Sequence, residues 1–234
     1  MVRRLHALQK TSLTITAIVL LGCVYLAFSN IWYSPAIEAR LVTPQGDPVA
    51  GAIIVAGWNI EGPWNGSPRG QLAVAEVLSD KDGKFNIPAW GPRRAKEGHI
   101  RIDEPTLRIY RPGYLPLVIK NYEDVPMRSA SHILQFRLQG KNIVLQPFQG
   151  PLPEYEVALT ALLDSLSNIY SQQGPGTCYW RDTPRILLAL QDLKWQLSPL
   201  GGGNSLRKAY EYANTKTPPQ CGDAFEFFRD FKRP

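Results

Sequence analysis

Residues 39–57 read ARLVTPQGDPVAGAIIVAG, two apolar runs separated by a short segment rich in Pro and Gly. The runs predict strands over 37–43 and 52–60, because apolar and β-branched residues bounded by turn residues are typical of strands. Between them, residues 44–48 predict a turn in which Gly46 takes a positive φ. This stretch favours a β-rich body, and the same alternation of strand and turn signals continues toward the C-terminus.

Further turn signals occur up to residue 147, among them SDKDG at 79–83, where Gly83 suits a positive φ. The chain of 234 residues contains 19 Gly and 20 Pro without a repeating period, which excludes collagen and indicates many turns. Residues 34–150 are therefore predicted to be a mainly β domain, a seven-stranded antiparallel sandwich. Its later strands are expected at 72–78, 84–90, 106–110, 115–120, 132–138 and 142–147, with a long loop at 61–70.

The spacing of apolar residues changes to a helical period after residue 150. One amphipathic helix is predicted over 154–172 and a second over 185–197, the latter preceded by Thr183-Pro184. Asn204 is expected to cap a third helix, and a short aromatic segment, 225–231, ends the chain. Residues 151–234 are thus predicted to form an α-helical appendage to the sandwich.

The first 33 residues predict a membrane anchor. Residues 1–10 are positively charged, and residues 11–33 contain no charged side chain. Those 23 positions would form a helix of about 34 Å, enough to cross a ~30 Å hydrocarbon core. Trp32 and Tyr33 would lie at the interface, and the positive-inside rule places residues 34–234 outside the cytoplasm. We expect a single-pass protein of the bacterial inner membrane with its C-terminal part in the periplasm.

Two other fates of this leader stay open. Residues 20–23 (LLGC) resemble a lipobox, in which Cys23 would carry the lipid, and the small residues near 27–29 would suit signal-peptide cleavage. The leader also holds Arg3, Arg4 and Lys10, three of the charges that give the chain its formal net charge of +6. Subtracting them leaves +3 without a sustained basic stripe, which argues against nucleic-acid binding.

Two cysteines, Cys178 and Cys221, remain beyond the leader. In an oxidising periplasm we expect them to form a disulfide. A catalytic cysteine is the alternative, but it requires a base, and neither His99 nor His132 lies in a recognisable partner motif.

Three segments carry a resemblance to a known family. ARLVTPQGDPVAGAIIVAG (39–57), VLSDKDGKFNIPAW (77–90) and LRIYRPGYLPL (107–117) are similar to the strands and turns of carboxypeptidase regulatory-like domains. The resemblance implies a transthyretin-like β-sandwich, a non-catalytic module of exported and envelope proteins. It covers nearly half of the chain and leaves the leader and the helical tail outside.

Candidate sites are few. Asp80 and Asp82 hint at a calcium loop, but the further oxygen ligands and the distal Glu of such a loop are missing. With three His in the chain, no metal centre or cofactor site is indicated. A hydrolase site would have to use Glu97, His99 and Asp182. The remaining candidates are aromatic side chains that could stack on glycans or contact a partner: Trp58, Trp64, Trp90 and Trp180.

The sequence as a whole favours a non-enzymatic, membrane-anchored binding or scaffolding protein of the cell envelope. Its partner would be another envelope protein or a cell-surface glycan, and its oligomeric state is not indicated. A hydrolase-like envelope enzyme and a lipoprotein subunit associated with assembly or pili are the alternatives.

Overall fold

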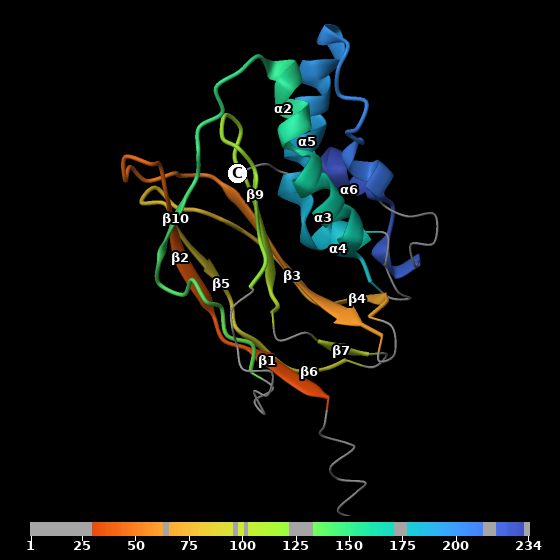
Figure 1. Cartoon of the computed structure of the whole chain (residues 1–234). Coiled ribbons are helices and arrows are strands. Elements are labelled where there is room, and N and C mark those ends of the chain that lie inside the picture. Colours follow the sequence, from red (N-terminus) through yellow and green to blue (C-terminus); the bar gives the residue numbers. More distant parts are fainter. Residues whose placement is uncertain are drawn as a thin grey trace, which may run out of the picture.

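The computed structural model describes residues 30–62, 66–95, 98–100, 103–121, 133–170, 177–212 and 219–231. Figure 1 shows a layer of helices packed on a larger β-sheet, with smaller sheets on the opposite side. The mainly β fold with antiparallel sheets and added helices is as predicted, whereas the seven-stranded sandwich is not confirmed, because the described strands are divided among three sheets.

The larger sheet has the strand order β4-β3-β8-β9, and β7 also pairs with β3. All of these pairs are antiparallel. The predicted loop at 61–70 is shorter than expected, because β4 begins within it and continues the pairing with β3. The strands are β3 (Ile53–Glu61), β4 (Pro68–Leu78), β7 (His99–Ile100), β8 (Thr106–Tyr110) and β9 (Leu117–Ile119).

Two smaller sheets complete the β part, with the orders β10-β2-β5 and β1-β6. β10 runs parallel to β2, so the prediction of a purely antiparallel body was wrong there. The alternation of apolar residues is the same for either strand direction, which is why the sequence pattern could not reveal it. The strands are β1 (Ile31–Ser34), β2 (Ile37–Val42), β5 (Lys84–Ile87), β6 (Trp90–Arg94) and β10 (Asn142–Val144).

Part of the segment predicted as a strand at 132–138 is described, from residue 133 onward, and forms no strand there. Its alternation is nevertheless real, since Leu134 and Phe136 are buried. Leu134 donates its backbone N–H to the carbonyl of Tyr33 at 2.9 Å, and Ile133 forms an isolated bridge with Tyr33. The side chains therefore follow the predicted pattern without a continuous ladder.

The helical layer differs from the prediction in two places. The helix expected over 154–172 is divided at Leu159 into α2 and α3. Residues 201–208 are not helical, so only a 3-10 turn, η2, occurs where the third helix was expected. The second helix is confirmed as α5. The helices are α2 (Leu152–Ala158), α3 (Thr160–Tyr170), α4 (Tyr179–Asp182), α5 (Pro184–Leu197) and α6 (Ala224–Asp230), with the 3-10 turns η1 (Ser198–Leu200), η2 (Ala209–Tyr212) and η3 (Pro219–Cys221).

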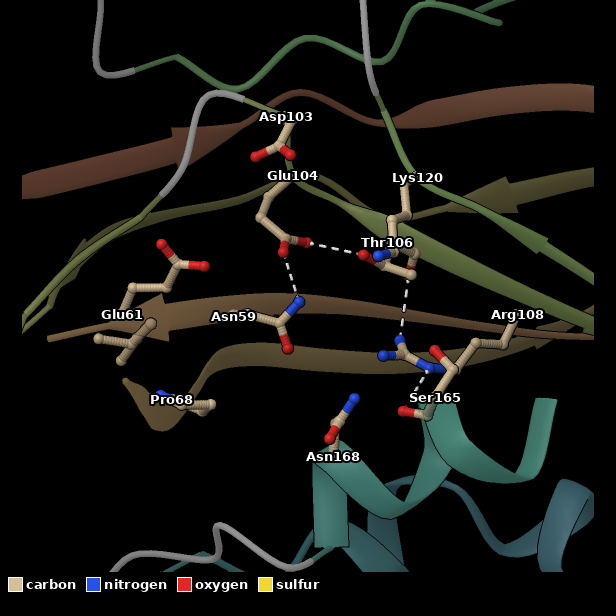
Figure 2. A pocket seen from close by; sticks show the side chains of 11 residues that line it. Asn59, Glu61, Pro68, Asp103, Glu104, Thr106, Arg108, Lys120, Ser165 and Asn168 are labelled. Atoms are coloured by element: carbon tan, nitrogen blue, oxygen red, sulfur yellow. Dashed lines mark hydrogen bonds between the residues drawn. The ribbon is translucent and has the colours of Figure 1, made fainter. Parts of the chain in front are cut away.

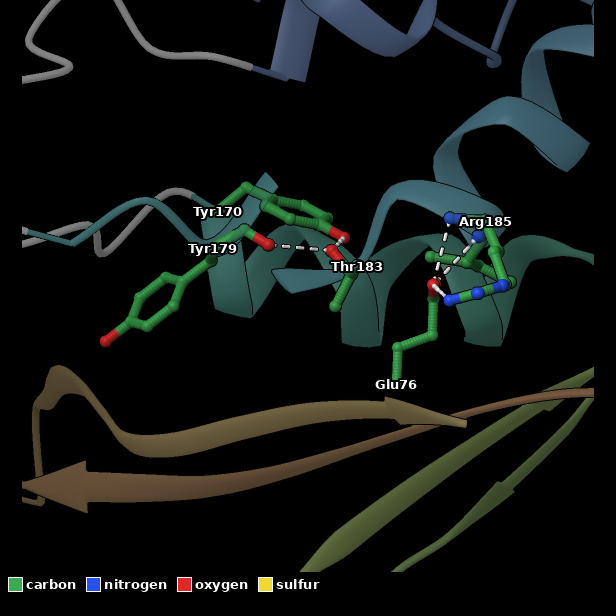
Figure 3. A network of polar contacts seen from close by, with 6 residues as sticks. Glu76, Tyr170, Tyr179, Thr183 and Arg185 are labelled. Carbon is green, nitrogen blue, oxygen red and sulfur yellow. Dashed lines mark hydrogen bonds and ion pairs between the residues drawn. The ribbon is translucent and has the colours of Figure 1, made fainter. Parts of the chain in front are cut away.

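Polar contacts join the helical layer to β4 (Figure 3). The Glu76 carboxylate accepts the backbone N–H groups of Arg185 and Ile186 at 2.9 Å each, at the start of α5. Burial raises the pKa of Glu76, while these hydrogen bonds lower it. The Thr183 hydroxyl donates to the carbonyl of Tyr179 at 2.8 Å and lies 2.7 Å from the Tyr170 hydroxyl. The first turn of α5 is thus satisfied by a β-strand residue rather than by its own N-cap side chain.

The predicted disulfide between Cys178 and Cys221 is confirmed, with the two Cα atoms 5.6 Å apart. It joins the segment before α4 to η3, and Cys221 is fully buried. The bond therefore ties the C-terminal part of the helical layer to α4.

The first described residues correct the limit of the predicted membrane segment. Residues 31–33 belong to β1, and Trp32 is 8% exposed within the core between the sheets. The β body thus includes residues 31–33, which the prediction assigned to the membrane segment, and Trp32 is not an interfacial aromatic residue. Residues 1–29, with the lipidation candidate Cys23, lie outside the described residues. Among the helices of the described ranges, none is long and apolar enough to cross a membrane.

Candidate functional site

A polar pocket lies on the helix-facing side of the larger sheet, between β3, β8 and α3 (Figure 2). Its volume is about 180 Å³. We call it the polar chamber. Its lining combines side chains of both charge signs with amides and hydroxyls: Asn59, Ile60, Glu61, Pro68, Asp103, Glu104, Thr106, Arg108, Lys120, Ser165 and Asn168.

Because Gly57 has no side chain, it leaves space for the side chains of Gln71 and Arg108 beside the chamber. A Cβ atom at this position would lie 2.8 Å from Gln71 Oε1 and 2.9 Å from Arg108 Nη1. Both distances are shorter than van der Waals contact, so any larger residue would displace the amide or the guanidinium. Gly57 pairs with Thr106 of β8, one step along the ladder from the Ala56–Leu107 pair. The absence of a side chain in mid-strand therefore has a local structural reason.

Glu104 supplies a carboxyl group that is almost fully buried, with 5% of the residue exposed. The Asn59 amide donates to one of its oxygens, and the Thr106 hydroxyl donates to the other at 3.3 Å. Burial raises the pKa of Glu104 to about 7, against the lowering effects of the Asn59 amide and the Arg108 charge. This carboxyl group changes its charge near neutral pH.

Arg108 lies in the middle of β8 and is 1% exposed. Its Nε donates to the backbone carbonyl of Ser165 in α3 at 3.0 Å, and its Nη1 donates to the carbonyl of Thr106 at 3.2 Å. Burial lowers the pKa of Arg108 to about 10, which leaves the guanidinium charged at neutral pH. Because it bonds to main-chain oxygens of both a strand and a helix, the guanidinium also fixes α3 against the sheet.

The rest of the chamber wall carries charges that are less buried. Glu61 and Asp103 are half-buried, whereas Lys120 and Asn168 are exposed. Each of the three charged residues has an interaction partner in the structure. A molecule entering the chamber would meet carboxylates and an ammonium group at the opening and the Glu104–Arg108 pair behind them. Such an arrangement suits a small ligand that carries both a cationic and an anionic group.

The aromatic residues singled out from the sequence mostly belong to the interior. Trp58 and Trp180 are fully buried, which removes them as surfaces for glycan stacking. Trp58 packs edge-on against the half-buried Trp90, with ring centroids 5.2 Å apart, and Trp180 packs edge-on against Phe227 at 5.2 Å. Trp64 lies outside the described residues. These three described rings fill the two cores, and the structure brings none of them into the polar chamber.

The residues of the hydrolase hypothesis have different neighbours. His99 is exposed on β7, where it pairs with Glu61 of β3. Asp182 ends α4, and burial raises the pKa of its carboxyl group while Arg93 and Arg181 lower it. Glu97 lies outside the described residues. The two described members are thus embedded in separate contacts, one on the sheet and one on the helical layer.

The calcium hypothesis rested on Asp80 and Asp82. The Asp80 carboxylate accepts the backbone N–H groups of Asp82 at 2.9 Å and Lys84 at 2.8 Å. Gly83 has φ +76°, as predicted, and a Cβ there would lie 2.3 Å from the Leu41 carbonyl oxygen. The side chain of Asp80 and the glycine therefore serve the turn between β4 and β5.

The polar chamber itself was missed by the sequence analysis. One signal was present, because Arg108 places a charged side chain in the middle of the strand TLRIY, in which every residue is buried. A charged residue in such a strand requires partners. Its partners come from α3 and from residue 106, and their approach depends on helix packing that the sequence pattern does not specify.

Comparisons with known proteins give no family for the chain. No family model matches it, and no curated protein matches it. Three solved structures that it resembles in part are a hydroxyquinol 1,2-dioxygenase from Pseudomonas putida DLL-E4, a 3-chlorocatechol 1,2-dioxygenase from Rhodococcus opacus 1CP and a streptococcal ancillary pilin.

The identities are 18%, 12% and 14%, and the TM-scores are 0.29, 0.31 and 0.26. The matches cover 50%, 50% and 52% of this chain, and 57%, 60% and 30% of the other chains. The chain thus spans less than two thirds of each neighbour. TM-scores this low establish neither a common fold nor a common activity.

Proposed function

We propose that this protein is a membrane-anchored, non-enzymatic binding protein of the bacterial cell envelope, built on a carboxypeptidase regulatory-like β module. In this proposal, the residues before Asn30 hold it in the inner membrane, and the described body binds its ligand in the periplasm. The observation that carries the proposal is the polar chamber, in which a buried carboxyl group and a buried guanidinium are held in place by hydrogen bonds.

The membrane part of the proposal is supported by the leader. Residues 11–29 are 19 consecutive uncharged positions, which would form a helix of about 28 Å at ~1.5 Å per residue. That length still matches the hydrocarbon core, although residues 31–33 belong to β1. The disulfide supports export, because such bonds persist in oxidising compartments.

The proposal of ligand binding is supported by the hydrogen bonds that fix the side chains of the chamber. Neutral amide and hydroxyl donors orient the Glu104 carboxyl group, and main-chain oxygens orient the Arg108 guanidinium. Groups fixed in this way lose little freedom when a ligand binds, which favours affinity. The chamber holds about 180 Å³, so we propose a small zwitterionic ligand, such as an amino acid, an amino sugar or the end of a peptide.

Thermal unfolding of the full-length chain in detergent tests the ligand class. The probes are a dipeptide, glucosamine and, as an anionic comparison, succinate. A zwitterionic ligand at a hundred times its Kd would add about 2.7 kcal/mol of stability, or roughly 5–10 °C in Tm. Succinate is expected to give a smaller shift.

Two matched variants place the same bulky ring at neighbouring positions of α3, one that lines the chamber and one that does not. Asn168→Trp would obstruct the chamber from an exposed position, whereas Ser167→Trp adds the same ring at the neighbouring exposed position, which does not line the chamber. We expect the shift to disappear in the first variant and to persist in the second. Equal shifts in both variants would contradict the assignment of the chamber. Recovery of the full-length protein in the soluble fraction would contradict membrane anchoring.

A further inference from the structure

We infer that the β1–β6 ribbon binds the anionic headgroups of the bilayer into which the leader inserts. The ribbon is defined by residues 31–34 and 90–94, and the inference rests on the proposed membrane anchoring. Figure 1 shows β1 and β6 at the end of the body opposite α2.

The ribbon begins directly where the uncharged run of the leader ends. That run extends through residue 29, and β1 starts at Ile31. Asn30, the residue between them, is bonded to the body. Its side-chain amide donates to the carbonyls of Ala95 and Gly98, the latter at 2.8 Å, and its own carbonyl accepts the Ala95 N–H at 3.2 Å. No linker therefore separates the run from the folded body.

Two arginines lie directly across the ribbon from its first residues. The register pairs Ile31 with Arg94 and Trp32 with Arg93. Cα atoms paired in this way are about 4.5–5.5 Å apart, so both arginines lie within a few ångströms of the point where the chain would leave the membrane. This distance is smaller than the Debye length of about 8 Å at physiological ionic strength, so water and salt would screen their charges only in part.

Both arginines are exposed, in a strand whose last four residues are all exposed. Arg93 is partly engaged, since its Nη1 donates to the Leu72 carbonyl at 3.2 Å and its guanidinium lies 5.4 Å from the Trp90 ring centroid. Its charge also acts on the Asp182 carboxylate. Its neighbour Arg94 pairs with Ile31 through the strand ladder, but the Arg94 side chain makes no hydrogen bond or ion pair with the described part of the chain. Its guanidinium, a bidentate donor, is therefore available for a phosphate.

The composition of the ribbon fits a lipid surface better than another class of partner. Tyr33, on the same strand, is 44% exposed, and its ring lies over Gly91, where a Cβ would approach to 2.5 Å. A tyrosine beside arginines is the combination found where proteins meet the headgroup layer. Basic residues this close to an anionic bilayer each strengthen association by roughly five-fold.

Lipid selectivity of the full-length protein tests the inference. The protein is reconstituted into vesicles with equal parts of phosphatidylglycerol and phosphatidylcholine, extracted gently, and its bound lipids are counted by native mass spectrometry. We expect enrichment of phosphatidylglycerol in the wild type. Arg94→Gln should lower the enrichment by roughly five-fold, and the double variant R93Q/R94Q further.

The control is K81Q/K84Q, which removes two exposed charges at the end of the small sheet remote from β1. Its enrichment should equal that of the wild type. Arg3, Arg4 and Lys10 are present in every variant, so their contribution cancels in the comparison. Arg94→Gln alone keeps the test valid if the loss of the Arg93 contacts perturbs folding.

The outcomes separate this inference from the proposed function. Membrane insertion with equal lipid ratios in the wild type and R93Q/R94Q overturns the headgroup contact and leaves the anchoring intact. Failure of the wild type to insert into vesicles overturns the anchoring itself. A loss of enrichment in K81Q/K84Q equal to that in R93Q/R94Q would show a non-specific charge effect and also overturn the inference.

Discussion

The Tyr179 hydroxyl forms two hydrogen bonds with the backbone of Gln71, although the two residues are 108 positions apart. It accepts the Gln71 N–H at 3.1 Å and donates to the Gln71 carbonyl at 2.9 Å. Gln71 lies in β4, the outermost strand of the larger sheet. One phenol thus satisfies both main-chain groups of a buried edge residue, as a neighbouring strand would.

Tyr179→Phe should therefore destabilise the protein more than the loss of one hydroxyl group suggests. The variant leaves a buried donor and a buried acceptor without partners, each of which costs roughly 1–3 kcal/mol. We expect a decrease of about 2–4 kcal/mol in the free energy of unfolding, measured by urea titration. Tyr33→Phe, at a residue that is 44% exposed, is the matched control and should change stability little. Equal effects of the two substitutions would refute this role of Tyr179.

Glu76→Ala should weaken the attachment of α5. The variant removes the acceptor for the Arg185 and Ile186 N–H groups, and no side chain of the N-cap residue replaces it. N-cap losses cost about 0.5–2 kcal/mol, and the partial burial of these amides places the expected loss near the upper end. Hydrogen exchange should show faster opening of α5 than of the β3–β8 pair. Unchanged protection of the first turn of α5 would argue against this prediction.

Glu104 should make stability fall as pH rises through the weakly acidic range. Its pKa is raised from 4.5 to about 7 in the folded state, so the folded protein binds the proton more tightly than the unfolded chain does. The contribution is fully present below about pH 4.5 and is lost as pH approaches 7, with a total of up to roughly 3 kcal/mol. Glu104→Gln should remove this part of the pH dependence.

Urea titrations at several pH values between 4.5 and 7 measure the effect of Glu104. Glu38→Gln, at an exposed strand position, is the control and should retain the wild-type slope. A slope in Glu104→Gln as steep as that of the wild type would assign the pH dependence to other groups.

Opening the disulfide should destabilise the helical layer. The bond joins residues 43 positions apart, and the chain-entropy model gives about 4 kcal/mol for a loop of this size. The double variant C178S/C221S is expected to lose most of that amount in a urea titration. Reduction of the wild type should give the same decrease, whereas the reductant should leave the double variant unchanged. A wild type insensitive to reduction would show that the native contacts alone hold this segment.

Local structure was predictable where one face of the chain is plainly apolar. The strand from Ile53 follows directly from its run of aliphatic residues, and Gly83 from its turn sequence. The division of the first long helix at Leu159 was not predictable, because Leu159 continues the apolar stripe and is itself fully buried. Periodicity reports which side chains are buried and is insensitive to a local break in the backbone.

The site was less accessible from the sequence, since its members come together only through packing. Asn59 lies 45 positions before Glu104, and a helix beginning more than fifty residues after Arg108 closes the chamber. Trp32 shows the same limitation, because its place in the sequence suggests a membrane-interface position whereas the fold buries it. Next to a hydrophobic leader it has the appearance of a membrane-interface residue, but pairing of β1 with β6 directs it into the core.

β3 has buried side chains on both of its faces, and its consecutive residues serve different neighbours. Ile54, Ala56 and Trp58 belong to the core between the sheets, while Ile53 and Val55 belong to the core beneath the helices. Substitutions at alternate positions of β3 should therefore affect different cores, and their effects on stability should be almost independent. A deletion of one residue just before Trp58 would reverse the faces of the residues that follow it, placing Trp58 against the helices and turning the chamber's Asn59 toward the sheet core.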